Sequence, residues 1–248
     1  MMFSVVAPSK TASNLVPCVA AIRSEEPALG PSRIIIVDDG LGERGVSWDA
    51  IGCTVIPNER RGGQFVFSAA INVGIREALK DSSIHGIVAT NDDALLESPG
   101  GFSLLAAEAE AHPEYGIIGA TTNKTGQPLQ WRRTGEGSGL RTVPHIAFVC
   151  VYIPRRTLET VGLLDERYCL PGKYGCEDLD YCEAVTRAGL KVGVHDGCFV
   201  DHASLTSSFR GDPSAPGDFL PHLELCIAKW GGSLQCHPTA VNLLRRAS

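Results

Sequence analysis

Short apolar runs that end in polar residues alternate with amphipathic segments along the first half of the chain. The runs have the length of buried strands, and the longer segments carry apolar residues at helical spacing. The predicted strands lie at 3–7, 33–37, 85–90 and 115–120. The predicted helices lie at 13–23, 68–80 and 101–111, the last of them stopping before Pro113. This alternation predicts an α/β fold with a mostly parallel central sheet flanked by helices.

The second half of the chain is less regular. Residues 121–144 are rich in Thr, Asn, Gly, Gln and Arg and predict a loop or hairpin. The remaining elements are a buried strand, a short helix, an acidic helix that stops at Gly189, a strand and an amphipathic helix, at 146–153, 156–161, 177–188, 192–194 and 219–230. Residues 203–218 are rich in Ser, Gly and Pro, which predicts a mobile loop. No internal repeat is visible, so we expect one globular domain over 1–248.

Three of the predicted strands end in polar residues. The strand at 33–37 runs into Asp38 and Asp39, and the strand at 85–90 runs into 91–93, which reads Asn-Asp-Asp. The first strand ends at Pro8 and Ser9. Ligands of open α/β sheets bind beyond the carboxyl ends of the strands, so we expect these side chains to converge on one crevice.

Another acidic cluster opens the helix near residue 177. Glu177, Asp178 and Asp180 fall within its first turn, which suits the helix dipole and by itself needs no further role. Together with the acidic strand ends, however, these carboxylates would repel one another. A divalent cation or an acid–base function would explain why they are tolerated.

Six motifs in the same order resemble those of the GT-A glycosyltransferases, specifically the family 2 type. The motifs are Val37-Asp-Asp-Gly40, Ala70-Ile-Asn72-Val-Gly74, Asn91-Asp-Asp93, Gly162-Leu-Leu-Asp-Glu166, Tyr174-Gly-Cys-Glu-Asp-Leu-Asp180 and Lys229-Trp-Gly231. The resemblance spans residues 3–231. The chain departs from the family pattern at Leu41, at Asn91, which replaces the first acidic residue of D-x-D, at Cys176, where Gly is more frequent, and before Arg155, where a glycine-rich start is absent.

The resemblance implies an inverting transfer of a sugar from a nucleotide-diphosphate donor to an acceptor hydroxyl. It implies that Asp93 and His202 hold Mn²⁺ or Mg²⁺, with His202 favouring Mn²⁺. Asp178 would be the general base and Glu177 would hold sugar or acceptor hydroxyls. Asp180 would make a structural contact within its helix turn.

The implied nucleotide-sugar site lies in a first half that ends near residue 120, and the acceptor and catalytic half follows from about 121. Its residues would be Pro8, Ser9, Asp38, Asp39, Asn72, Asn91 and Asp92. The two aspartates after the second strand would bind base and ribose, and Asn72 would approach the nucleotide from a helix N-terminus. UDP is the preferred nucleotide, with GDP and dTDP open.

The composition limits the size of the core, the partners and the cellular compartment. The 248 residues are 44% hydrophobic, enough for one sizeable core, and the net charge of −6 argues against non-specific coating of nucleic acid. Four Arg pairs are expected to be solvated, at 60–61, 132–133, 155–156 and 245–246. No signal peptide is visible, the longest apolar run is far shorter than the roughly 20 residues of a membrane span, and the nine scattered cysteines form no C-x-x-C pair. We therefore expect a cytoplasmic protein with reduced thiols and without zinc.

Other functions fit these residues less well. Residues 40–45 fit G-x-G-x-x-G, but a poor helix follows and two aspartates precede it, which disfavours a dinucleotide site. Residues 7–13 lack the glycine-rich phosphate loop of a sugar nucleotidyltransferase. The acceptor is a glycan or lipid-linked saccharide by default, or alternatively a hydroxymethylated base in DNA, which would have to leave the stack. A non-catalytic nucleotide-sugar or glycan-binding module is the alternative from another class. The sequence does not indicate an oligomeric state.

Overall fold

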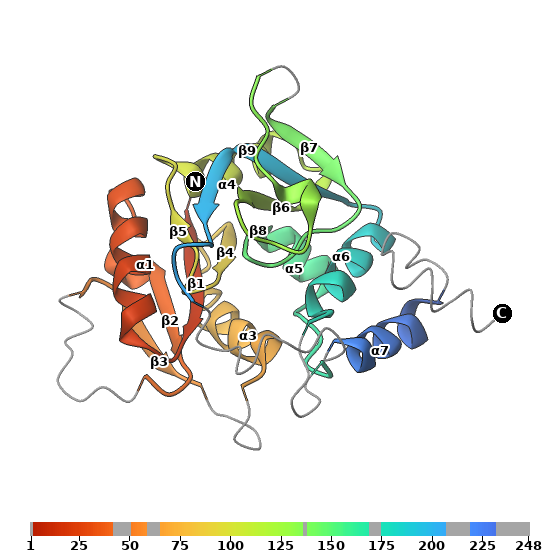
Figure 1. Cartoon of the computed structure of the whole chain (residues 1–248), viewed down its shortest axis with the longest axis horizontal. Coiled ribbons are helices and arrows are strands. Elements are labelled where there is room, and N and C mark those ends of the chain that lie inside the picture. Colours follow the sequence, from red (N-terminus) through yellow and green to blue (C-terminus); the bar gives the residue numbers. More distant parts are fainter. Residues whose placement is uncertain are drawn as a thin grey trace.

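A central sheet lies between two layers of helices in the computed structural model (Figure 1). The structure describes residues 2–41, 51–58, 65–135, 138–168, 175–206 and 219–231. The strands are β1 (Phe3–Ser9), β2 (Ile34–Asp38), β3 (Thr54–Pro57), β4 (Gly86–Thr90), β5 (Leu95–Leu96), β6 (Tyr115–Thr122), β7 (Leu140–Val143), β8 (Cys150–Pro154) and β9 (Lys191–Asp201). The α-helices are α1 (Ala12–Glu25), α3 (Phe67–Ala78), α4 (Gly101–Ala111), α5 (Arg155–Val161), α6 (Glu177–Arg187) and α7 (Leu220–Trp230). Short 3₁₀ turns are η1 (Pro31–Arg33) and η3 (Pro128–Gln130).

The strand order is β3-β2-β1-β4-β8-β6-β9-β5, and β7 also pairs with β9. Strands β1 to β4 pair in parallel, as do β6 and β9. β8 is antiparallel to both β4 and β6, so β6 and β9 point the same way as β1 to β4. Of the described strands, only β5, β7 and β8 run in the opposite direction. The predicted α/β fold with a mostly parallel sheet is therefore confirmed.

Side chains alternate between the two faces of the sheet, as successive residues of a strand must. In β1, Val5 packs with α1 and α4, whereas its neighbour Val6 packs with α3, α5 and α6. Each face thus buries a separate apolar cluster. A third, smaller cluster joins α6 to α7, which lies beside it at the right of Figure 1.

Three predicted segments of the second half differ from the structure. The apolar run at 146–153 does not form a strand until Cys150, and a turn at 147–149 precedes it. Residues 121–144, predicted as a loop or hairpin, contain β7, which pairs antiparallel with the distant β9. β9 itself extends well beyond the predicted 192–194 and ends at Asp201. Its direction brings that end to the same edge of the sheet as the ends of β1, β2 and β4.

Candidate active site

The predicted metal ligands lie together at this edge of the sheet. Nε2 of His202 lies 3.1 Å from Oδ1 of Asp93, and both side chains are largely buried. The ring is fixed from its other side, because Nδ1 lies 2.7 Å from the Lys124 carbonyl oxygen. The His202 backbone N–H also donates to Oδ1 of Asn123 at 2.9 Å. The ends of β9 and β6 thus place the His202 imidazole beside the Asp93 carboxylate, which follows β4.

The tautomer of His202 follows from these contacts. A carbonyl oxygen only accepts, so Nδ1 carries a proton and Nε2 faces the Asp93 carboxylate either as a second N–H or with a lone pair. Burial by itself would lower the pKa of His202, but the hydrogen bond to Asp93 and its charge outweigh burial and raise the pKa. Asp93 and His202 could hold a divalent cation, whose charge would take the place of that proton.

The donor groups of Asp93 and His202 suit a divalent cation. One carboxylate and one imidazole suit Mn²⁺, and the carboxylate alone suits Mg²⁺. Among the described residues, no cluster of three or more His, Cys, Asp and Glu side chains is arranged to hold a metal ion.

The neighbouring residues of this motif connect it to the sheet. Ser9, the last residue of β1, donates to Oδ2 of Asp92 at 2.7 Å, and both are buried. Nδ2 of Asn91 lies 3.5 Å from Nε2 of His202, beside the proposed metal pair. Asp92 therefore holds β1 against the motif, while Asn91 and Asp93 face His202. Pro8, directly before Ser9, is buried within β1.

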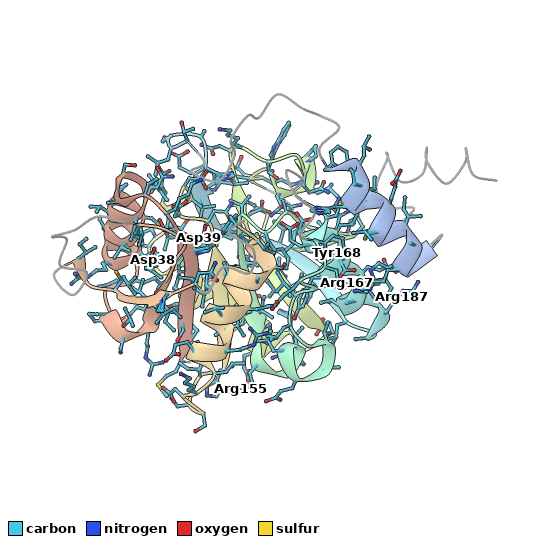
Figure 2. All side chains as sticks on the ribbon, turned by 90° about the horizontal axis from the view of Figure 1, so that it is seen from below. Asp38, Asp39, Arg155, Arg167, Tyr168 and Arg187 are labelled. Carbon is cyan, nitrogen blue, oxygen red and sulfur yellow. The ribbon has the colours of Figure 1, made fainter. Side chains whose placement is uncertain are left out.

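Asp38 and Asp39 lie where β2 ends (Figure 2). Oδ1 of Asp38 accepts from the backbone N–H groups of Gly40 and Leu41, at 2.7 and 2.6 Å, and so shapes the turn after the strand. Asp39 is almost fully buried, and its Oδ1 accepts from Nδ2 of Asn58 at 2.9 Å. Both aspartates reach the expected edge, and both are hydrogen-bonded within the protein.

Glu177 and Asp178 open α6, as the sequence predicted. Burial raises the pKa of both carboxyl groups, and the Asp178 charge helps to raise that of Glu177 to about 8. Backbone N–H groups of Leu179 and Phe148 act in the opposite direction on the pKa of Asp178. The Leu179 N–H lies 2.7 Å from Oδ1 of Asp178. The pair thus retains a proton more readily than ordinary carboxylates do, and backbone donors support Asp178 as the anion.

A three-residue turn, 147–149, joins the metal motif to this carboxylate pair. The Val149 carbonyl accepts from the Asn91 backbone N–H at 2.9 Å. The backbone N–H of the adjacent residue, Phe148, lowers the pKa of Asp178 and therefore lies near its carboxylate. Asn91 and Asp178 are far apart in the chain, yet each contacts the same short turn. The two predicted clusters therefore lie on either side of this turn.

No protein-family model and no curated protein matches the sequence. Solved structures do match. A structure of GalNAc-T7 with UDP, GalNAc and Mn²⁺ superposes with a TM-score of 0.71 at 14% identity, over 95% of this chain and 49% of that one. Residues 1–349 of TarS from S. aureus superpose with a TM-score of 0.57 at 13% identity, over 92% of this chain and 65% of that one. Both are glycosyltransferases.

The chain has the GT-A fold. At such low identity the likeness concerns the fold alone. The chain spans about half the length of the GalNAc-T7 structure (49%) and 65% of the TarS structure.

Within this GT-A fold, Asn72 does not occupy the predicted place. It lies in the middle of α3, which begins at Phe67, and not at a helix N-terminus. Nδ2 of Asn72 donates to the Leu164 carbonyl at 2.8 Å and to Oε1 of Glu166 at 3.0 Å, while its Oδ1 accepts from the Leu164 N–H. The buried amide thus fastens segment 162–166 to α3. Glu166 belongs to the same structural contact, which no local pattern indicated.

Asp180 is structural, as predicted, but its contacts lie outside its own helix turn. Its buried carboxylate accepts from the Tyr168 hydroxyl at 2.9 Å, from Nε1 of Trp230 at 2.6 Å and from Nζ of Lys229 at 2.9 Å. Nζ of Lys229 also donates to Asp165 at 2.9 Å. Three of the sequence motifs therefore form one network that binds α7 to α6, and Figure 2 shows Tyr168 beside these helices. Sequence analysis assigned no role to Lys229 or Trp230.

The departure at Cys176 has a conformational consequence. This residue precedes α6 with φ of 72°, the left-handed region in which Gly is favoured. Its side chain is buried against α7, so the strained backbone is accompanied by apolar packing. All seven cysteines among the described residues are free and buried, in agreement with the predicted small apolar role.

The prediction of solvated Arg pairs was wrong for 155–156. Arg155 donates to the carbonyls of Ile84 and Asp81, at 2.6 and 2.8 Å, and Arg156 donates to that of Ala109 at 2.7 Å. These side chains connect the start of α5 to the loop before β4 and to the end of α4. They lie at the edge of the sheet opposite the candidate site. Arg132 and Arg133 are exposed as predicted. The other two pairs lie outside the described residues.

Two further predictions concern the mobile loop and the absence of a membrane span. Most of the predicted mobile loop, residues 207–218, and Tyr174 lie outside the described residues. Over the part that the structure describes, none of the helices has the length and apolar character to cross a membrane.

Proposed function

We propose that this chain is a metal-dependent inverting glycosyltransferase that moves a sugar from a nucleotide-diphosphate donor, with UDP as the first choice, to an acceptor hydroxyl. The carrying observation is the turn at 147–149, which contacts Asn91 on one side and Asp178 on the other. A metal-binding motif and a proton-accepting carboxylate in one GT-A site are what glycosyl transfer requires. The GalNAc-T7 neighbour, solved with UDP, GalNAc and Mn²⁺, supports the donor class.

Asp93 and His202 would hold the divalent cation, Mn²⁺ in preference to Mg²⁺. When bound, the ion stabilises the negative charge that develops on the diphosphate leaving group. The Lys124 carbonyl and Asn123 orient His202 for this purpose. Such outer contacts fix the ring and its tautomer, so they belong to the site as much as the ligands do.

Asp178 would accept the proton of the acceptor hydroxyl as that oxygen attacks the anomeric carbon. Backbone N–H groups of Leu179 and Phe148 support its anionic form. Glu177, whose pKa is raised to about 8, would hold the proton shared by the pair near neutral pH and donate a hydrogen bond to a sugar or acceptor hydroxyl. A single displacement with one base inverts the anomeric carbon.

The nucleotide would lie across the ends of β1, β2 and β4. In this proposal Asp38 and Asp39 bind base and ribose, and Asn91 orients ribose or water at the cation. Asp92, Pro8 and Ser9, which are buried at the ends of β4 and β1, would lie beneath the nucleotide. Asn72 is left out, since both polar atoms of its amide are engaged by residues 164 and 166.

The nucleotide experiment is calorimetry of UDP binding with and without Mn²⁺. We expect binding to strengthen with the ion in the wild type and to lose that gain in Asp93→Ala. Asp81→Ala is the matched control, because Asp81 is an exposed carboxylate in the loop before β4, where it caps a turn through Ser83. Equal UDP affinity with and without Mn²⁺ in the wild type would remove the metal assignment.

Mass spectrometry of products tests the transfer itself. The protein is incubated with a panel of nucleotide sugars and with acceptor pools that include saccharides, lipid-linked saccharides and hydroxymethylated DNA. A mass increase of one sugar residue on a saccharide acceptor is expected, and a product on DNA would select that alternative. Nucleotide binding without product in any pool would favour a non-catalytic module. The acceptor class and a cytoplasmic location stay predictions from the sequence.

A further inference from the structure

Gln130 makes an unusual contact for a buried polar side chain. It ends η3 and has no exposed surface. Its Nε2 donates to the Ala147 carbonyl at 3.0 Å, and its Oε1 accepts from the Ala147 N–H at 2.6 Å. One amide side chain thus satisfies both hydrogen-bonding groups of one backbone residue. Buried amides of this kind are retained at a cost unless each polar atom has a partner, and here both have one.

Ala147 begins the turn that joins the two halves of the proposed site. Its carbonyl also accepts from the Val149 N–H at 2.8 Å, which closes the turn. The Val149 carbonyl in turn accepts from Asn91, and the Phe148 N–H reaches Asp178. The turn therefore connects Gln130 to both functional residues.

Arg141 holds the segment that carries Gln130. The guanidinium of Arg141 donates to the carbonyls of Leu129 and Trp131, at 3.0 and 3.4 Å, on either side of Gln130. Arg141 is also paired with the buried carboxylate of Asp196 at 2.9 Å. The segment that carries Gln130 is thus anchored to β7 and β9, and the turn is anchored to that segment.

We propose that Gln130 is a positioning residue for the transfer reaction: through Ala147 it holds the 147–149 turn in the shape that places Asp178 and Asn91 in one site. This inference rests on the proposed function. A displacement of about 1 Å between base and donor site is enough to lower a rate on the order of 10²-fold. Losing the Gln130 contacts should therefore act on turnover more than on nucleotide binding, because Asp93 and His202 have their own supports.

The test compares Gln130→Met with Gln127→Met. Methionine matches glutamine in size and cannot make the Ala147 hydrogen bonds. Gln127 lies three residues earlier. Its Oε1 accepts from the Leu129 N–H and its Nε2 contacts His145, so its variant disturbs η3 and His145 but removes no hydrogen bond to Ala147. We expect kcat of Gln130→Met to fall about 10- to 100-fold with the UDP–Mn²⁺ Kd within about twofold of wild type, and kcat of Gln127→Met to stay within a few-fold of wild type.

Hydrogen exchange supplies a readout that does not depend on activity. In Gln130→Met the amides of Ala147, Phe148 and Asn91 should exchange faster, while those of β1 and β2 keep wild-type protection. If Gln130→Met does not fold, Gln130→Glu replaces it. Its carboxyl can both donate to and accept from Ala147 when protonated, so the ratio of its kcat to that of wild type should rise as the pH is lowered.

The outcomes separate the two proposals. A folded Gln130→Met with wild-type kcat, or a fall in kcat no larger than that of Gln127→Met, would overturn the positioning role and leave the proposed function intact. A Gln130→Glu ratio that does not change with pH would count against it in the same way. Failure of the wild type to transfer sugar from any donor would overturn the proposed function, even if hydrogen exchange showed the turn loosened.

Discussion

Replacing Asp180 by Ala should be among the most destabilising single changes in this protein. The carboxylate is 2% exposed and accepts from Tyr168, Lys229 and Trp230, which come from two other segments of the chain. Alanine would leave three donors without their acceptor, two of them neutral groups in a largely apolar cluster. α7 has few other polar attachments to the rest of the fold among the described residues.

The magnitude follows from these donors. Each buried donor left without a partner costs about 1–3 kcal/mol. Lys229 loses less, because Nζ keeps Asp165 at 2.9 Å and 27% of its side chain is exposed. The total should be about 3–5 kcal/mol, the range found when one partner of a buried charged pair is removed. Asp180→Asn keeps the shape and part of the acceptor function, so about 2 kcal/mol is expected.

The assay is equilibrium unfolding in urea, followed by fluorescence and circular dichroism. Asp165→Asn is the matched control, because Asp165 shares Lys229 but pairs mainly with Arg167, whose side chain is 69% exposed; we expect a loss below about 1 kcal/mol. Hydrogen exchange should show α7 losing protection first in Asp180→Ala. If the free energy of unfolding of Asp180→Ala fell by less than about 1 kcal/mol, water would be hydrogen-bonding to the three donors. The Asp180 network would then not be the main attachment of α7.

Three further outcomes are expected. Asp178→Asn should lower turnover on the order of 10²-fold with nearly unchanged UDP affinity, and normal turnover combined with an inactive Glu177→Gln would exchange the two roles. Because the pKa of Glu177 is raised in the folded state from 4.5 to about 8, the folded form keeps a proton that the unfolded chain releases, so its contribution to stability is lost as the pH rises through this window. Urea unfolding from pH 4.5 to pH 9 should show this decline in wild type and a flatter profile in Glu177→Gln; parallel profiles would contradict it. Cys176→Gly should be more stable than Cys176→Ala by about 1 kcal/mol in urea unfolding, since only Gly relieves the left-handed backbone, and equal stability would mean that the position is not strained.

Local patterns in the sequence were sufficient for the order of the longer elements and for the edge of the sheet at which their polar ends meet, but not for β3, β5 and β7. Apolar runs such as 33–37 and the polar residues that stop them are local signals, and parallel strands bring their ends together without further information. Cys176 and Asp180 were also recognised, one as a departure from Gly and the other as structural. The side chains of Asp93 and His202 meet as the motif order implied.

Only the tertiary structure decided what each polar residue contacts. Trp230 is 50 residues from Asp180 and Leu164 is 92 from Asn72, so no local pattern could pair them. The apolar run at 146–153 gave the same signal for a strand as for a buried turn. Its first residues are a turn because Gln130, from a distant segment, supplies the hydrogen bonds that a neighbouring strand would otherwise provide. Periodicity reports which residues are buried, whereas the partner of a buried polar group is set by how the whole chain packs.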